Sequence, residues 1–239
     1  MHSPVFVALD TTEGAAAADL AERLRGSIGG IKLGLEFFCA TGPSGIRRVA
    51  DCGLPVFLDL KLQDIPNTVA GAIRAIAPLA PFCTTLHAAG GGAMMRAARQ
   101  ASEEAAARLG TPRPLLLAVT VLTSLDGEAL AATGVGGALA DQVRRLAALA
   151  QDAGVDGVVC SPHEAAALRA QCGPDFKLMV PGIRPHWAAA DDQKRILTPA
   201  QAVAAGADYL VIGRPITAAA DPAAAARRIA DELAGHPGA

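Results

Sequence analysis

Residues 56–76, VFLDLKLQDIPNTVAGAIRAI, pass from an apolar run into a helix-forming one and set the pattern for the rest of the chain. The first five residues predict a buried strand, because the run is short and contains β-branched and aromatic side chains. Pro66 suits the first turn of a helix, where its missing N–H costs nothing. Asn67 or Thr68 is the expected helix cap. A strand that leads directly into a helix is the repeating unit of parallel α/β folds.

Three ionisable side chains lie at the junction between this strand and this helix. Asp59 and Lys61 are two positions apart at the end of the strand, so they project from the same face and are close enough to pair. Leu58 and Leu60 then point to the opposite face. Asp64 follows the strand as a loop residue and is free to point away from its own core. A charge cluster at the end of a buried strand is costly unless it is used.

Three interpretations of this cluster compete. The charges could form a structural ion pair, Lys61 could be a positioned acid, or the two carboxylates could hold a hard metal ion, although the ammonium beside them weakens that interpretation. The chain has only four lysines among 21 basic residues. Lysine can give up its proton near neutral pH whereas arginine cannot, so a lysine in an arginine-rich chain favours the positioned acid. Two flanking carboxylates keep its proton in place rather than make it a base.

The same strand-to-helix rhythm runs along the whole chain. Eight strands are predicted near residues 5–9, 31–33, 56–60, 82–87, 115–120, 156–160, 177–180 and 209–212. The helix-forming stretches that follow them lie near residues 15–25, 42–51, 67–77, 92–108, 139–152, 162–171, 199–205 and 215–234. Eight such pairs predict one α/β domain over residues 1–239, a (β/α)₈ or TIM barrel. A doubly wound sheet remains the alternative, but no Gly-x-Gly-x-x-Gly follows the first strand.

The composition excludes several classes of protein. The chain has 239 residues, of which 51% are hydrophobic and 18% charged, enough apolar material for one large core. A formal net charge of −2 and an aromatic content of 3% give no sign of a nucleic-acid surface. Five scattered cysteines without Cys-x-x-Cys suit buried thiols in a reducing compartment. No stretch approaches the roughly twenty apolar residues of a membrane span, so we expect a soluble, cytoplasmic protein.

Polar side chains recur where the predicted strands end. In a barrel of this kind the active site lies at the carboxyl ends of the strands. The polar residues and the glycine expected there are Asp10, Lys32, Asp59, Lys61, His87, Thr120, Thr123, Ser124, Arg184, Gly213 and Arg214. Ordinary surface-loop polarity explains one or two of these positions, but not charges at four strand ends. His87 could touch the site, and a hydrogen-bonded structural histidine is an equal alternative.

The last two strands predict a phosphate site, because barrels often bind phosphate between the loops that follow strands seven and eight. These loops hold Arg184 and Gly213-Arg214; Gly213 lets backbone N–H groups approach an anion, and Arg214 can grip it with a fork of donors. Residues 183–198 form a long polar segment, typical of a mobile lid or a binding loop. Gln193 and Arg184 are its expected ligand contacts.

Seven segments form a larger pattern along the chain. They are Ala8-Leu-Asp10, Ile31-Lys-Leu-Gly34, Asp59-Leu-Lys-Leu-Gln-Asp-Ile-Pro-Asn-Thr68, Val119-Thr-Val-Leu-Thr-Ser124, Asp156-Gly-Val-Val-Cys-Ser161, Val180-Pro-Gly-Ile-Arg184 and Val211-Ile-Gly-Arg-Pro-Ile-Thr217. Together and in this order they resemble the bacterial type of the orotidine 5′-phosphate decarboxylase family. The resemblance runs from residue 5 to about residue 230. Leu62-Gln63 departs from the Phe-His common in the family, which leaves the charged positions intact.

The resemblance implies decarboxylation of orotidine 5′-monophosphate to uridine 5′-monophosphate in de novo pyrimidine biosynthesis, with neither metal nor organic cofactor. It implies that Lys61 stabilises and then protonates the C6 carbanion. The charged tetrad implied by the family consists of Lys32, Asp59, Lys61 and Asp64. A homodimer is also implied, in which each subunit lends its partner Asp64, Ile65 and Thr68.

The remaining substrate contacts are carried over from the family in the same way. Asp10, Lys32 and the partner's Thr68 would contact the ribose. Thr123 and Ser124 would contact the pyrimidine. The phosphate would be held by Arg184, Gln193, Gly213 and Arg214.

Two other functions remain as alternatives to this resemblance. A metal-dependent sugar-phosphate decarboxylase of the same barrel superfamily shares the Asp-x-Lys-x-x-Asp core, and magnesium dependence would distinguish it. The Asp-Ile-Pro-Asn-Thr continuation at residues 64–68 speaks against it. A non-catalytic barrel that binds a phosphorylated metabolite is the other alternative, and tight nucleotide binding without turnover would select it.

Overall fold

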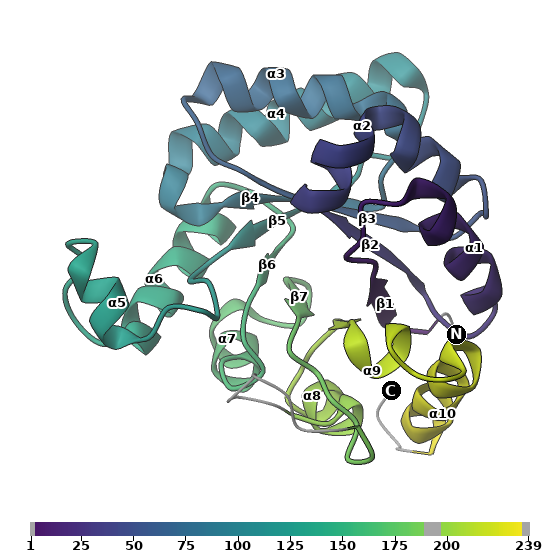
Figure 1. The fold of residues 1–239 in the computed structure, drawn as a ribbon. Coiled ribbons are helices and arrows are strands. Elements are labelled where there is room, and N and C mark those ends of the chain that lie inside the picture. The colour runs from purple at the N-terminus through teal and green to yellow at the C-terminus, as the bar shows by residue number, and fades with distance from the viewer. Residues whose placement is uncertain (1–2, 189–196, 236–239) are drawn as a thin grey trace.

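A computed structural model describes residues 3–188 and 197–235 of the chain. Its centre is a closed barrel of eight parallel strands in sequence order, with β8 paired to β1. The strands are β1 (Val5–Ala8), β2 (Gly30–Gly34), β3 (Val56–Leu62), β4 (Cys83–His87), β5 (Leu115–Val119), β6 (Gly157–Val159), β7 (Lys177–Val180) and β8 (Tyr209–Ile212). Helices surround this barrel on the outside (Figure 1). The predicted (β/α)₈ barrel is therefore confirmed, and the alternative doubly wound sheet is wrong.

The described helices follow the predicted rhythm with some differences. They are α1 (Gly14–Leu24), α2 (Leu35–Ala50), α3 (Pro66–Ile76), α4 (Gly92–Leu109), α5 (Gly127–Ala132), α6 (Leu139–Asp152), α7 (Ala165–Cys172), α8 (Pro199–Ala204), α9 (Arg214–Thr217) and α10 (Pro222–Ala234). The prediction missed α5. It also joined α9 and α10 into one helix, whereas Asp221 starts a new helix by accepting a hydrogen bond from the backbone N–H of Ala224.

One predicted helix start and one predicted helix cap are wrong for local reasons. Helix α2 begins at Leu35 rather than at residue 42, and the backbone at Gly42 (φ 61°, ψ −165°) kinks it into two helical segments. A side chain disfavours this conformation, which glycine adopts freely. Helix α3 begins at Pro66, so its cap position is Ile65 rather than Asn67 or Thr68. Proline at the first position needs no hydrogen-bond partner for its nitrogen, which removes part of the demand for a polar cap.

The barrel packs in two apolar layers because strand side chains alternate between its faces. Leu58 and Leu60 point outward and pack with the surrounding helices, as predicted. Phe57 points into the barrel, where it packs edge-to-face against Phe6 at 6.3 Å between ring centroids. Gly30 makes room for this pair of rings, which we call the aromatic plug, because a Cβ at residue 30 would lie 2.3 Å from the Phe6 ring. The plug fills the amino end of the barrel interior and leaves the carboxyl end for other side chains.

The five cysteines are all free thiols. Cys83, Cys160 and Cys172 are buried, as predicted. Cys39 is exposed and Cys52 is half-buried, so the expectation of five buried thiols is wrong for these two. In the described ranges, none of the helices combines the length and the apolar character that a membrane span needs.

Candidate active site

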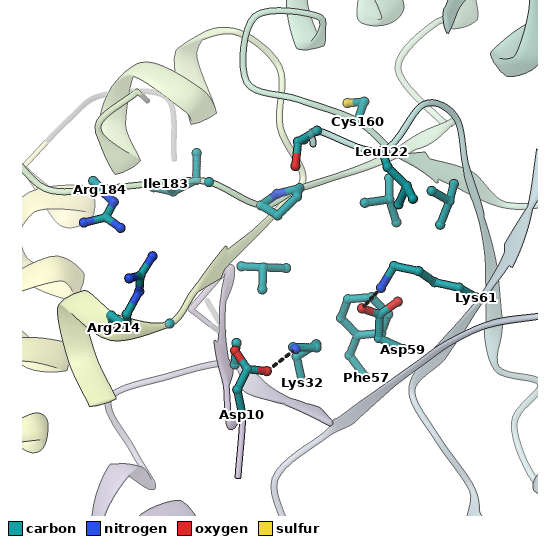
Figure 2. A pocket seen from close by; sticks show the side chains of 18 of the residues that line it. Asp10, Lys32, Phe57, Asp59, Lys61, Leu122, Cys160, Ile183, Arg184 and Arg214 are labelled. Carbon is teal, nitrogen blue, oxygen red and sulfur yellow. Dashed lines mark hydrogen bonds and ion pairs between the residues drawn. The ribbon is translucent and has the colours of Figure 1, made fainter. Parts of the chain in front are cut away.

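A cavity of about 320 Å³ opens at the carboxyl end of the barrel (Figure 2). Its volume falls in the range of small-molecule sites. It brings together eight of the thirteen predicted site residues, and they arise from six different strands or the loops behind them. These eight are Asp10, Lys32, Asp59, Lys61, Thr123, Arg184, Gly213 and Arg214.

Asp59 and Lys61 form the ion pair expected from their spacing. The Lys61 ammonium lies 2.5 Å from Asp59 Oδ2, and their side chains are 29% and 13% exposed. Both residues lie within β3 rather than at its end, because this strand continues to Leu62. The pair therefore sits on a rigid element that points it into the cavity (Figure 2).

Thr85 on β4 joins both members of this pair, and the sequence analysis missed it. Its hydroxyl donates to Asp59 Oδ1 at 2.7 Å and accepts from the Lys61 backbone N–H at 2.9 Å. Thr85 is fully buried. Strand alternation offers the signal that could have found it, since residues 83, 85 and 87 of β4 share the inward face.

Lys61 itself has an unusual backbone. Its φ is 50°, in the left-handed region that non-glycine residues rarely adopt, and the pairing of β3 with β4 shifts register between Leu58 and Leu62. Such a bulge re-aims the side chain of the strand that carries it. Strained backbone of this kind persists where surrounding contacts hold it, and it concentrates at functional sites.

A second lysine–aspartate pair lies beside the first, with its lysine on β2 and its aspartate just after β1 (Figure 2). The Lys32 ammonium on β2 donates to Asp10 Oδ1 at 2.7 Å. Lys32 is mostly buried, whereas the Asp10 side chain is exposed. Gly34 leaves room for the ammonium, because a Cβ there would lie 3.2 Å from Lys32 Nζ. Two lysines thus face one cavity from β2 and β3.

Two arginines line the other end of the cavity. Arg184 follows β7, is 5% exposed, and its backbone N–H donates to the Leu197 carbonyl at 3.0 Å. Arg214 begins α9 directly after Gly213. Figure 2 shows both guanidinium groups on the side of the cavity away from Lys61. The site therefore has one end lined by two arginines, a residue type suited to anions such as phosphate, and a separate end that holds Asp59 and Lys61.

The wall between these ends is largely apolar. Its apolar members include Phe57, Val119, Val121, Leu122, Val159, Cys160, Ile183 and Val211. Burial raises the pKa of the Cys160 thiol, so this group stays protonated and acts as part of the apolar wall. Such a wall suits one face of a flat ring and strengthens nearby electrostatic interactions by excluding water.

His87, whose role the sequence left open, lies at the end of β4. Burial and the positive charge of Lys61 lower its pKa, an effect that Asp59 partly offsets. A neutral imidazole therefore faces this charged pair at neutral pH.

Four predicted site residues lie outside this cavity. Asp64, Ile65, Thr68 and Ser124 are exposed, and none of them lines it. Asp64 Oδ1 accepts a hydrogen bond from the backbone N–H of Ile65 at 2.6 Å. The Ile65 side chain is 67% exposed, the largest exposure among the big apolar residues of the described chain. Gln193 lies outside the described residues.

The alternative of a metal site finds no ready ligand set in the described chain. Within residues 3–188 and 197–235, no group of three or more His, Cys, Asp and Glu side chains is placed to hold a metal ion. The two carboxylates that the sequence suggested as ligands, Asp59 and Asp64, do not line one cavity.

Comparisons with known proteins agree with this architecture. Residues 3–229 match the family described as "Orotidine 5'-phosphate decarboxylase / HUMPS family". The chain is 60% identical to the orotidine 5′-phosphate decarboxylase of Paramagnetospirillum magneticum, over 98% of this chain and 99% of that protein. It is 59% identical to that of Rhodospirillum rubrum, over 98% and 95%. The crystal structure of orotidine 5′-phosphate decarboxylase from Lactobacillus acidophilus is similar, with a TM-score of 0.84, 38% identity and coverage of 97% and 99%.

Proposed function

The chain belongs to the orotidine 5′-phosphate decarboxylase family, and from this premise we propose how its barrel removes CO₂ from orotidine 5′-monophosphate. The reaction class, a carboxy-lyase step of pyrimidine biosynthesis, rests on the family match and on relatives of 60% and 59% identity. The roles of individual residues rest on the geometry of the cavity. A cytoplasmic location is part of the proposal, and five free thiols support it because reducing compartments keep cysteines reduced.

The nucleotide lies along the cavity with its phosphate at the arginine end. Arg184 and Arg214 grip the phosphate, and Gly213 offers close backbone approach. Gln193, which lies outside the described residues, is proposed as a further phosphate contact by resemblance to the family. This orientation places the ribose beside the Asp10–Lys32 pair and the pyrimidine against the apolar wall near Thr123 and Ser124. The arginine pair at one end of the cavity and the Lys61 ammonium at the other support it, because orotidine 5′-monophosphate carries a phosphate at one end and a ring carboxylate at the other.

Lys61 carries the chemical step. The bond between C6 and the carboxylate breaks, CO₂ leaves, and its electron pair remains on C6. The Lys61 ammonium stabilises this developing carbanion and then donates a proton to C6, which yields uridine 5′-monophosphate. The neutral lysine recovers its proton from solvent. The 2.5 Å contact with Asp59 is the single observation that carries the proposal, because it holds the ammonium at the cavity wall before substrate arrives.

The carboxylates of Asp59 and Asp64 complete the site. Asp59 fixes the ammonium and lies where a substrate carboxylate would approach it, so repulsion is relieved as CO₂ departs. Lys32, on the neighbouring strand β2, is another member of the charged tetrad. No metal or organic cofactor takes part in these steps.

A homodimer supplies the missing member of the tetrad. Asp64, Ile65 and Thr68 of one subunit enter the site of its partner. Two observations support this arrangement: Asp64 does not line the cavity of its own chain, and the neighbouring Ile65 exposes 67% of its surface. A partner subunit that covers this loop would also remove the exposed Ile65 side chain from water, which is favourable.

Replacement of Lys61 by alanine tests the assigned role. We expect Lys61→Ala to lower kcat about 10⁴-fold, because it removes both the proton donor and the charge that stabilises the carbanion. Release of CO₂ from orotidine 5′-monophosphate measures the effect. Lys177→Ala is the matched control, because it removes another paired lysine. Lys177 begins β7, pairs with Asp208 and does not line the cavity. Unchanged kcat in Lys61→Ala would exclude the assigned role.

Subunit mixing tests the shared site. Lys61→Ala and Asp64→Ala are each expected to be inactive as homodimers. Their heterodimer contains one site with both residues intact, so mixing should restore about a quarter of wild-type activity if subunits exchange at random. Failure to recover activity, with subunit exchange demonstrated by differently tagged chains, would show that Asp64 acts in its own subunit.

A further inference from the structure

The Thr85 hydroxyl connects the two catalytic side chains of β3 from the neighbouring strand. It donates to Asp59 Oδ1 at 2.7 Å and accepts from the Lys61 backbone N–H at 2.9 Å. The other oxygen of the same carboxylate, Asp59 Oδ2, contacts the Lys61 ammonium at 2.5 Å. One buried hydroxyl thus touches the carboxylate on one side and the main chain of the lysine on the other.

The contact with the Lys61 main chain coincides with the least regular point of the barrel. Lys61 has a φ of 50°, and strand β3 loses its regular register with β4 around this residue. At this irregular point the Lys61 backbone N–H donates to a side-chain oxygen of β4. A buried backbone N–H needs a partner, so the hydroxyl makes the left-handed conformation of Lys61 tolerable.

We propose that Thr85 is a positioning residue for the decarboxylation, holding Asp59 in one rotamer and the Lys61 backbone in its left-handed conformation so that the ammonium points into the cavity. This role rests on the function proposed above. It also requires a hydroxyl in particular, because only a group that both donates and accepts can serve a carboxylate and an N–H at once.

The adjacent Thr84 offers a matched control. Thr84 and Thr85 are both fully buried threonines on β4 whose hydroxyls each donate one hydrogen bond to β3. The Thr84 hydroxyl donates to the Leu58 backbone carbonyl at 2.8 Å and contacts neither catalytic side chain. Valine has the shape of threonine without the hydroxyl, so the same substitution at the two positions separates loss of a buried hydrogen bond from loss of positioning.

The test compares Thr85→Val, Thr85→Ser and Thr84→Val in the otherwise intact protein. We expect Thr85→Val to lower kcat about tenfold or more, with KM nearly unchanged, because a reaction-specific orientation is lost while the phosphate grip remains. Thr85→Ser keeps the hydroxyl and should restore most of kcat. Thr84→Val should lower the denaturation midpoint without lowering kcat. Equal kcat in Thr85→Val and wild type, or equal losses in Thr84→Val and Thr85→Val, would overturn the proposal.

An NMR measurement separates this proposal from the proposed function. The chain has four lysines, so ¹⁵N-lysine labelling gives few ammonium signals, and the Lys61→Ala spectrum identifies the one from Lys61. Thr85→Val should shift this signal and Thr84→Val should leave it in place, whether or not the wild type decarboxylates the nucleotide. An unmoved Lys61 signal in Thr85→Val would refute positioning. If Thr85→Val does not fold, Thr85→Ala removes the hydroxyl with less bulk and takes its place in both measurements.

Discussion

The two ends of the barrel use similar ion pairs in opposite ways. At the amino end, Asp156 accepts hydrogen bonds from the Arg113 guanidinium at 2.5 and 2.8 Å and from the Leu116 backbone N–H at 2.7 Å. Asp208 repeats the pattern on the other side, with Arg169 at 2.5 Å and the Leu178 backbone N–H at 2.8 Å. Each carboxylate therefore ties a guanidinium to the first residues of a neighbouring strand.

At the carboxyl end the carboxylates pair with lysines and face a cavity. Asp59 reaches Lys61 and Thr85, and Asp10 reaches Lys32. Lysine carries a compact charge and a transferable proton, whereas the arginine fork suits fixed bidentate contacts. Both ends of the barrel therefore contain carboxylates paired with basic side chains, so the presence of an ion pair does not by itself identify a functional site. What distinguishes the two kinds of pair is the environment of the carboxylate. Asp156 and Asp208 accept hydrogen bonds from strand backbone N–H groups, whereas Asp59 and Asp10 line the cavity.

In the comparison of the two ends, the largest expected effect follows from weakening the Asp59–Lys61 pair at the carboxyl end. Asp59→Asn keeps the shape and the Thr85 contact but removes the charge that holds Lys61. We expect kcat to fall about 10²- to 10³-fold, because preorganised electrostatics is lost. The free energy of unfolding, measured by urea denaturation, should change far less than the barrier to decarboxylation does, because the Lys61 side chain is 29% exposed and its ammonium stays in contact with water in the open cavity. A loss of stability without a loss of kcat would place Asp59 among the structural pairs.

The same substitution at the amino end should have the reverse outcome. Asp156→Asn leaves the Arg113 guanidinium without its anion and removes one of the two carboxylates that contact Arg99, so we expect the free energy of unfolding to fall by about 3 kcal/mol. kcat, measured at a temperature where the variant remains folded, should equal that of wild type. A large fall in kcat in Asp156→Asn would contradict the claim that the ion pairs at the amino end serve stability alone.

A smaller effect is expected at the arginine end of the cavity. Arg214→Ala removes one charge-assisted contact to the phosphate and should raise KM about 10- to 100-fold. Because phosphate binding also helps to hold the substrate in place, kcat should fall as well. Arg108→Ala, an exposed arginine on α4, is the control. An unchanged KM in Arg214→Ala would remove this residue from the phosphate site.

The smallest effect concerns pH. Burial and Lys61 lower the pKa of His87, so the unfolded chain binds this proton more tightly than the folded chain does. Folding stability should therefore fall as pH drops through and below about 6.5, the ordinary value for histidine. His87→Gln should flatten this part of the curve, and His163→Gln, at an exposed position, should not. Denaturant midpoints between about pH 5 and pH 7.5 measure the difference, and equal slopes in all three proteins would contradict it.

Strand periodicity made the barrel predictable, and the same alternation placed Asp59 and Lys61 on one face. The start of α2 was not predictable in this way, because the Gly42 kink allows helix on both sides of it. The role of Thr85 was not predicted, because its two partners lie 24 and 26 positions away in the sequence and meet it only when β3 and β4 pair. The left-handed backbone of Lys61 could not be predicted either, because lysine rarely adopts this conformation and nothing in the sequence marks this one as an exception.

Release of CO₂ from orotidine 5′-monophosphate by chelator-treated wild-type protein tests the central claim most directly. We predict full turnover to uridine 5′-monophosphate after exhaustive chelation, with no gain when magnesium is returned, because the charges of the cavity itself drive the reaction. Turnover that disappears with the chelator and returns with magnesium would contradict this claim, and so would tight nucleotide binding without release of CO₂.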